Sequence, residues 1–171
     1  YANGDMNGFK LGGSGVVTPH VVLNCLSFNN GATGFTDNNN PSGLTIMNAT
    51  AWGNGKSAKK GNFLCYRASN KAVYVGLVSA NAIDSDKFTG NMSDSIYYNT
   101  GKYYRLSGLL PTPVVSGDKK GTVVDNPSKV SGMFKNAVDF INLNGNVDKQ
   151  LRNSDGSLNM KGLYETQGSY S

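Results

Sequence analysis

Apolar residues in this chain occur in short runs, and glycine or asparagine interrupts most of them. In the stretch GFKLGG, Phe9 and Leu11 alternate with Lys10, which is the two-residue period of a β-strand. If Phe9 and Leu11 face the interior, Lys10 faces outward. The runs show no helical periodicity. The pattern therefore predicts short strands that are joined by tight corners.

Two sequence elements recur along the chain. The segment VLNCLSFNNG at 22–31 aligns with IMNATAWGNG at 46–55, an offset of 24 residues, and a weaker copy, DSIYYNTG, follows at 94–101. A second element keeps a phenylalanine at positions 9, 35 and 63. Repeats of this length indicate a solenoid in which each unit forms one coil.

Short β-like units without helical periodicity favour an all-β fold, a right-handed parallel β-helix. Asn24 and Asn48 are expected at equivalent corners of neighbouring coils, where stacked asparagines satisfy backbone groups. Phe28 and Trp52 are expected to stack in the core. These four positions are the structural predictions that follow most directly from the repeat.

The repeat fades after about residue 101. Residues 1–101 are therefore predicted to form the coils, and 102–171 a terminal coil with an irregular C-terminal cap and wrapping segment of the same domain. The chain opens on YANGDMNGF, which is typical of the middle of a domain. We expect an N-terminal chain or segment to complete the β-helix by covering the edge of its first coil.

The composition agrees with an all-β chain, because 22 glycines and many asparagines disfavour long helices. The net charge of +5 predicts attraction to polyanions. There is no Arg-rich helix or RNA-recognition motif and no apolar run long enough for a bilayer, so neither nucleic acid nor membrane is expected as a partner. Cys25 and Cys65 lie in apolar strand-like runs, which favours buried thiols over a disulfide.

The motifs GFKLGG, HVVLNCLSFNNGATGFTDNNN and LTIMNATAWGNG resemble the last coils of polysaccharide lyase family 9, which contains pectate lyases. The tail FKNAVDFINLNGNVDKQLRNSDGSLNMKGLY is similar to the family's C-terminal end. The resemblance implies a parallel β-helix that cleaves uronate-containing chains by β-elimination. It also implies that Lys10, the lysine of GFKLGG, is the catalytic base.

The family's calcium is held by aspartates on coils before this motif, including a local Asp-Asp-Gly-Trp-Asp type of sequence. The resemblance therefore implies Ca²⁺ as the cofactor. Because this chain contains no such sequence, no metal ligand is assigned within it. The resemblance further implies a secreted or extracellular protein that acts on an acidic plant polysaccharide, either pectate or rhamnogalacturonan.

Several polar residues after Lys10 are candidates for substrate binding. Two interpretations are open for Asn38, Asn39 and Asn40: they form hydrogen bonds to sugar hydroxyls, or they form a polar turn. Two interpretations are also open for the basic residues: they bind carboxylates of the polymer, or they belong to a solvated basic loop. These residues are Lys56, Lys59, Lys60 and Arg67. The isolated acids are interpreted as turn residues: Asp84, Asp86 and Asp94.

The leading hypothesis is a fragment of a pectate-type lyase with Lys10 as its base, inactive alone if its calcium ligands lie elsewhere. One alternative is a non-catalytic β-helix that binds acidic glycans. Another is a structural β-helix such as a surface adhesin.

Overall fold

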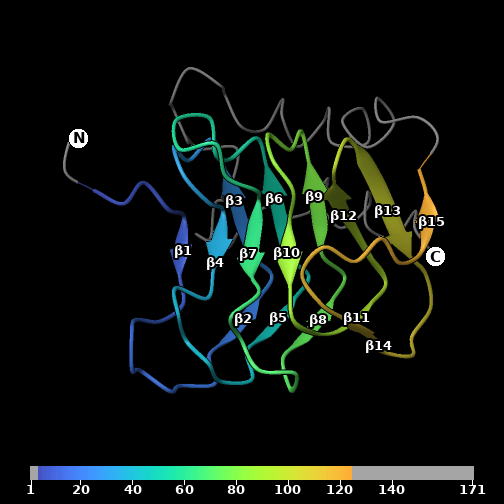
Figure 1. Ribbon diagram of the computed structural model, residues 1–171, viewed down its shortest axis with the longest axis horizontal. Coiled ribbons are helices and arrows are strands. Elements are labelled where there is room, and N and C mark those ends of the chain that lie inside the picture. Colours follow the sequence, from blue (N-terminus) through green and yellow to red (C-terminus); the bar gives the residue numbers. More distant parts are fainter. Residues whose placement is uncertain (1–3, 125–171) are drawn as a thin grey trace, which may run out of the picture. The chain divides into compact units, whose positions relative to one another are not determined.

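The computed structural model describes residues 4–124, and over that range it contains fifteen strands and no helix. The strands form three sheets (Figure 1). Sheet A contains β1 (Phe9–Lys10), β4 (Phe35–Thr36), β7 (Phe63–Cys65) and β10 (Lys87–Phe88). Sheet B contains β2 (Val21–Leu23), β5 (Thr45–Met47), β8 (Val73–Val75), β11 (Gly90–Ser93) and β14 (Thr112–Val114). Sheet C contains β3 (Leu26–Phe28), β6 (Thr50–Trp52), β9 (Val78–Ala80), β12 (Ser95–Asn99), β13 (Lys102–Leu106) and β15 (Thr122–Val123).

Each coil contributes one strand to each sheet, and the same strand of the next coil pairs with it in parallel. Val21 pairs with Thr45 in sheet B, and Leu26 pairs with Thr50 in sheet C. Both pairs are separated by the 24 residues of the sequence repeat. The chain thus forms a parallel β-solenoid of about three turns, and the predicted fold class is confirmed.

A column of phenylalanine rings fills the interior behind sheet A. Phe9 stacks on Phe35 at 4.6 Å between ring centroids, and Phe35 stacks on Phe63 at 5.1 Å. Phe88 continues the column at 5.6 Å with a tilted ring. Parallel in-register pairing places the same residue type at the same level in each coil, so these rings stack as an offset column. Phe35 and Phe63 are fully buried.

The corner between sheets B and C turns at one residue with left-handed backbone geometry. Asn24 and Asn48 occupy it with φ of 55° and 51°, and Asn48 Nδ2 donates to Asn24 Oδ1 at 3.3 Å. The third coil has Gly76 there, with φ of 63°. Asparagine and glycine tolerate this conformation best. The predicted equivalence of Asn24 and Asn48 is confirmed.

A buried amide ladder joins successive coils inside the solenoid. Asn30 Nδ2 donates to Asn54 Oδ1 at 2.8 Å, and Asn54 Nδ2 donates to Asn62 Oδ1 at 2.8 Å. Asn62 Nδ2 continues to Ser79 Oγ and to the carbonyl of Ala80. Unsatisfied buried amides are costly, so this ladder favours one coil register over others.

Asp86 connects the last coils. It is buried, and its two carboxylate oxygens accept the backbone N–H groups of Phe63 at 2.9 Å and Tyr98 at 2.8 Å. Burial raises the pKa of Asp86 to about 6. The sequence interpretation of Asp86 as a turn aspartate therefore understates its role as a buried link between sheets A and C.

Parallel pairing ends after the fourth strand of sheets B and C. β13 pairs antiparallel with β12, β14 with β11, and β15 with β13. The described residues, 4–124, belong to one compact unit. The division at residue 101 remains a prediction, since most of the expected cap, 102–171, lies outside the described residues.

Two further expectations have clear outcomes. Phe28 and Trp52 pair in register, but both are only half-buried, and the inward positions beside them are the small residues Ser27 and Ala51. Their expected stacking in the core was wrong because strand alternation puts them on the other face of sheet C. Both cysteines are free thiols, as predicted, although only Cys65 is buried. Within the described range, no helix could cross a membrane.

The phenylalanine column should contribute far more to stability than the outer aromatic row. We expect Phe35→Ala to lower the free energy of unfolding by about 3–5 kcal/mol, because it removes a fully buried ring that packs between two others. The matched control, Phe28→Ala on the half-buried outer row, should cost less than half as much. Urea-induced unfolding measures both, and equal losses would contradict the assignment.

Stability should also depend on the protonation of Asp86. Its pKa is about 6 in the fold and 3.8 in the reference state, so its contribution is complete below about pH 4 and is lost as the pH rises through 6. Relative to Asp86→Asn, the wild-type protein should lose up to about 3 kcal/mol between pH 4 and pH 7. Urea unfolding at four pH values tests this, and a pH-independent difference would refute it.

Candidate functional site

The outward face of sheet A carries a row of side chains that runs from coil to coil. Lys10 pairs in register with Thr36, Thr36 with Leu64, and Leu64 with Lys87. Figure 1 shows their strands, β1, β4, β7 and β10, side by side along the solenoid. Because the inward positions hold the phenylalanine column, these alternate positions face solvent.

Lys10 lies at the first position of this row. Its side chain is 45% exposed, and its Nζ donates to the carboxylate of Asp5 in an ion pair. The pKa of Asp5 is lowered, first by this hydrogen bond and then by the charge of Lys10. The outward orientation of Lys10 agrees with the strand pattern, and its role as a base remains a prediction.

A cleft of about 380 Å³ lies beside Lys10. It contains the ion-pair partner of Lys10, Asp5, and the register partner of Lys10, Thr36. Two basic side chains, Lys60 and Arg67, also line it. The remaining lining residues are Asn7, Ala32, Thr33, Asp37, Asn38, Ala58, Leu64 and Tyr66. Lys10 itself does not line the cleft, but its partners Asp5 and Thr36 do, together with cationic and hydrogen-bonding groups.

Asp37 holds the floor of this cleft together. Its carboxylate accepts the backbone N–H groups of Asn39 at 3.2 Å, Arg67 at 2.6 Å and Ala68 at 3.0 Å. It is 2% exposed, and burial raises its pKa. Its position after Phe35 and Thr36 gave no sign of this role, because the two loops that it joins are about 30 residues apart.

The three consecutive asparagines have different environments. Asn38 lines the cleft with a positive φ of 49°, and its Nδ2 donates to the carbonyl of Gly12. Asn39 is half-buried, and its Nδ2 donates to Ser14 Oγ at 3.4 Å. Asn40 is fully buried, and its amide bonds to backbone groups, including the carbonyl of Leu11. The structure thus supports the polar-turn reading for Asn40, whose amide is buried away from any sugar hydroxyl.

Only one of the three neighbouring lysines reaches the cleft. Lys60 lines it, whereas Lys56 lies 6.0 Å from the ring of Trp52, and Lys59 is exposed with a φ of 53°. The three lysines are therefore close in sequence but do not share the cleft.

Beyond Lys60, Arg67 stands at the far side with two residues that sequence reasoning did not select. Arg67 Cζ lies 5.0 Å from the ring centroid of Tyr66, and Lys87 Nζ lies 5.8 Å from the same centroid. The only sequence signal was the out-facing position of Lys87 in KFTG, which requires the strand register to be known.

The carboxylates near the cleft do not form a calcium cage. Asp5 pairs with Lys10, and Asp37 is saturated by backbone N–H groups. Between residues 4 and 124 there is no group of three or more His, Cys, Asp or Glu side chains placed to hold a metal ion. Calcium prefers six to eight oxygen ligands, so these residues do not fit it.

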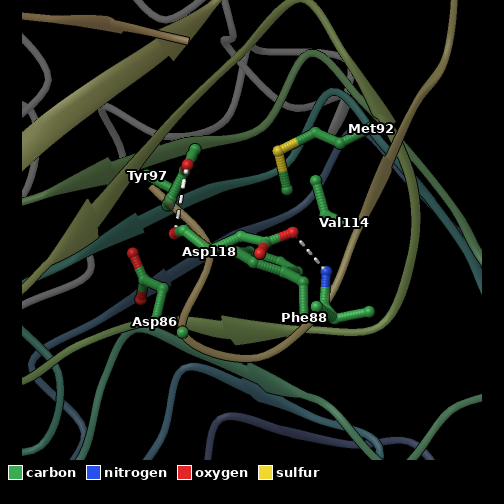
Figure 2. Close-up of a pocket in the computed structure, with 8 residues that line it drawn as sticks. Asp86, Phe88, Met92, Tyr97, Val114 and Asp118 are labelled. Atoms are coloured by element: carbon green, nitrogen blue, oxygen red, sulfur yellow. Dashed lines mark hydrogen bonds between the residues drawn. The ribbon is translucent and has the colours of Figure 1, made fainter. Parts of the chain in front are cut away.

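A second cavity is too small for a sugar. Figure 2 shows Asp86, Phe88, Met92, Tyr97, Val114 and Asp118 around it, and its volume is about 10 Å³. The backbone N–H of Val115 donates to the Asp118 carboxylate at 2.9 Å across one wall. That volume is sufficient for about one water molecule.

The fold and the cleft define a class, the parallel β-helix protein with a polar, charged groove on the outer face of one sheet. Comparison with known families is more specific. Residues 1–73 match a family described as a Pel9A-like, right-handed β-helix region. No solved structure gave a significant match.

Curated relatives agree with this family. The chain is 32% identical over 159 residues to pectate lyase L of Paenibacillus polymyxa, covering 93% of this chain and 28% of that protein. It is 57% identical over 53 residues to pectate lyase L of Thermoclostridium stercorarium, covering 31% and 4%. It is 44% identical over 55 residues to pectate lyase PEL9 of Emericella nidulans, covering 30% and 13%.

These matches support a pectate lyase family 9-like protein, and the matched region is described as a right-handed β-helix. The resemblance seen in its motifs is thereby confirmed. The chain spans less than a third of the length of each of these three relatives.

The role of Asp37 in the cleft floor is testable by substitution. Asp37→Ala leaves three backbone N–H groups without their acceptor, and we expect it to destabilise the fold by at least about 1–3 kcal/mol. Asp84→Ala is the matched control, because Asp84 is exposed and its carboxylate accepts the N–H of the adjacent Ser85 rather than joining distant loops. Urea unfolding of both variants is the measurement, and similar curves would contradict this role.

Proposed function

We propose that this chain is part of a pectate-type polysaccharide lyase in which Lys10 accepts a proton from the substrate. The observation that supports it most directly is the position of Lys10. It is outward-facing on sheet A and pairs with Asp5, which lines a charged cleft, in a chain whose relatives are pectate lyases. The proposed substrate is an acidic pectic polysaccharide.

The chemistry is a β-elimination. Lys10 Nζ removes the proton from C5 of a uronate, the C5–H electron pair forms a C4=C5 double bond, and the C4–O bond breaks. The glycosidic oxygen leaves and takes up a proton from solvent. To act as a base, Lys10 must first release a proton and its contact with Asp5. Asp5 is exposed, so binding of a polymer carboxylate at Lys10 can displace it.

The cleft walls bind and orient the polymer in this proposal. Lys60 and Arg67 attract uronate carboxylates, and Asn38 and Thr36 face the cleft with polar groups. Asn39, which is next to Asn38 in the chain, is proposed to contact the polymer at the edge of the cleft. Lys56 and Lys59, which lie apart from the cleft, add to the overall positive charge.

Calcium remains the proposed cofactor, with ligands that would have to lie outside residues 4–124. The polymer substrate also supports a secreted or extracellular protein. Rhamnogalacturonan is the second candidate polysaccharide.

A non-catalytic uronate-binding β-helix is the competing function. The ion pair of Lys10 with Asp5 favours it, because a lysine that pairs with one carboxylate can pair with a uronate carboxylate in the same way, without removing a proton. The two functions differ in whether an unsaturated product forms.

The complete gene product should produce unsaturated uronate from polygalacturonate, which absorbs in the ultraviolet. Lys10→Ala should lower kcat by a factor of about 10²–10⁴, the usual contribution of a general base. Lys102→Ala, which removes an exposed lysine on β13 of sheet C, is the matched control and should be unchanged. Assays with calcium and with chelator also test the cofactor.

Three results would overturn the proposal or one of its parts. Wild-type activity that survives Lys10→Ala excludes Lys10 as the base. Absence of product from every uronate polymer, with binding retained, favours the non-catalytic function. Activity that is unaffected by chelator excludes calcium as the cofactor.

A further inference from the structure

Two cations from neighbouring coils flank a single aromatic ring at the far end of sheet A. Tyr66 and Arg67 directly follow β7, and Lys87 begins β10. Arg67 Cζ and Lys87 Nζ lie 5.0 and 5.8 Å from the Tyr66 ring centroid. All three side chains belong to exposed residues. We name them the Tyr66 cluster.

The cluster is held on fixed backbone. Thr89 Oγ1 donates to the carbonyl of Tyr66 at 2.8 Å, which ties the loop after β7 to the next coil. The backbone N–H of Arg67 is bound by Asp37. Contact with the ring restricts the two long side chains, so less entropy is lost when they bind an anion.

The charges of the cluster are poorly balanced. In residues 4–124, ion pairs connect Lys10 with Asp5 and Lys120 with Asp118, and none includes Arg67 or Lys87. Asp37 attracts Arg67 electrostatically, but it is buried and already accepts three backbone N–H groups. Two like charges beside one ring repel each other in the free protein, and a bound anion would relieve this repulsion.

The register relates the cluster to Lys10. Lys10, Thr36, Leu64 and Lys87 lie on consecutive strands, so Lys87 is three strand spacings from Lys10, or roughly 14 Å along the solenoid. One strand spacing is comparable to the length of a sugar residue. A polymer that lies along the row would reach the cluster two or three sugars away from Lys10.

We propose that Tyr66, Arg67 and Lys87 form a distal subsite that binds the carboxylate of a uronate two or three residues from the one at Lys10. This subsite rests on the proposed function for its substrate class. The Arg67 guanidinium supplies paired donors to a carboxylate, Lys87 supplies a second charge, and Tyr66 positions both. The subsite would select long, de-esterified segments.

Substrate length is the decisive variable in the test. We would measure kcat and KM of the complete gene product on a series from di- to octagalacturonate, for wild type, Arg67→Gln/Lys87→Gln and Tyr66→Ala. For the longer oligomers, loss of the two charges should raise KM about ten-fold or more with kcat changed less than two-fold. Lys87→Gln alone should raise KM for the longer oligomers only, because Lys87 does not line the cleft and the shortest oligomers do not span the row.

Controls separate charge from folding. Lys87→Arg in the Arg67-containing protein should retain most of the length dependence, and Lys102→Gln should retain all of it. Thermal melts should show that each variant is folded, as expected for exposed side chains. In Lys87→Gln, a uniform rise in KM at every length, or no rise at any length, would overturn the subsite while the lyase activity stands.

Gel retardation in polygalacturonate keeps the two proposals distinguishable. If wild type is inactive but retarded, and the double variant is less retarded, the subsite stands and the lyase function falls. If wild type is not retarded and is inactive, both fall. Equal loss of retardation in polygalacturonate and in DNA would overturn uronate recognition, because it indicates a surface for any polyanion. If the double variant loses as much retardation in highly methyl-esterified pectin as in polygalacturonate, recognition of the uronate carboxylate is also overturned.

Discussion

In-register hydrogen bonding between successive coils is the constraint on which this structure depends. It places Phe9, Phe35 and Phe63 at one level and makes them a stacked column. The same register aligns the outward residues between those rings into a row. A slip of one residue would exchange the two faces, exposing the rings and burying Lys10. Stability and the candidate site therefore share one geometric cause.

Buried polar groups make that register specific. The Asn30–Asn54–Asn62 ladder bonds amide to amide across coils, and Asp86 binds backbone N–H groups from two sheets. Apolar stacking by itself tolerates small shifts, whereas a shifted buried amide loses its partner. These polar links thus select one arrangement of coils, and a rigid outer face follows from it.

On that face, the chemistry is distributed over several coils rather than gathered in a deep pocket. Lys10 belongs to the first described coil, Lys60 and Arg67 flank the third strand of sheet A, and Lys87 belongs to the fourth. Such a row suits an extended polymer with a charge on every sugar. It also explains why a positively charged chain of low overall charge density can present a basic surface where it is needed.

The sequence by itself determined the parallel β-helix, the outward position of Lys10, the asparagine corners and the resemblance to pectate lyases. Each is encoded locally or by a repeat, because strand alternation and left-handed corners depend on residue type. Only the tertiary structure decided which residues share the cleft. It separated Lys60 from Lys56 and Lys59, buried Asn40, and brought Tyr66 and Lys87 together from different coils. It also assigned Asp37 and Asp86 to buried links. Coil lengths vary between these segments, so which cleft residues lie close together depends on the strand register of sheet A. Neither composition nor the 24-residue repeat encodes that register.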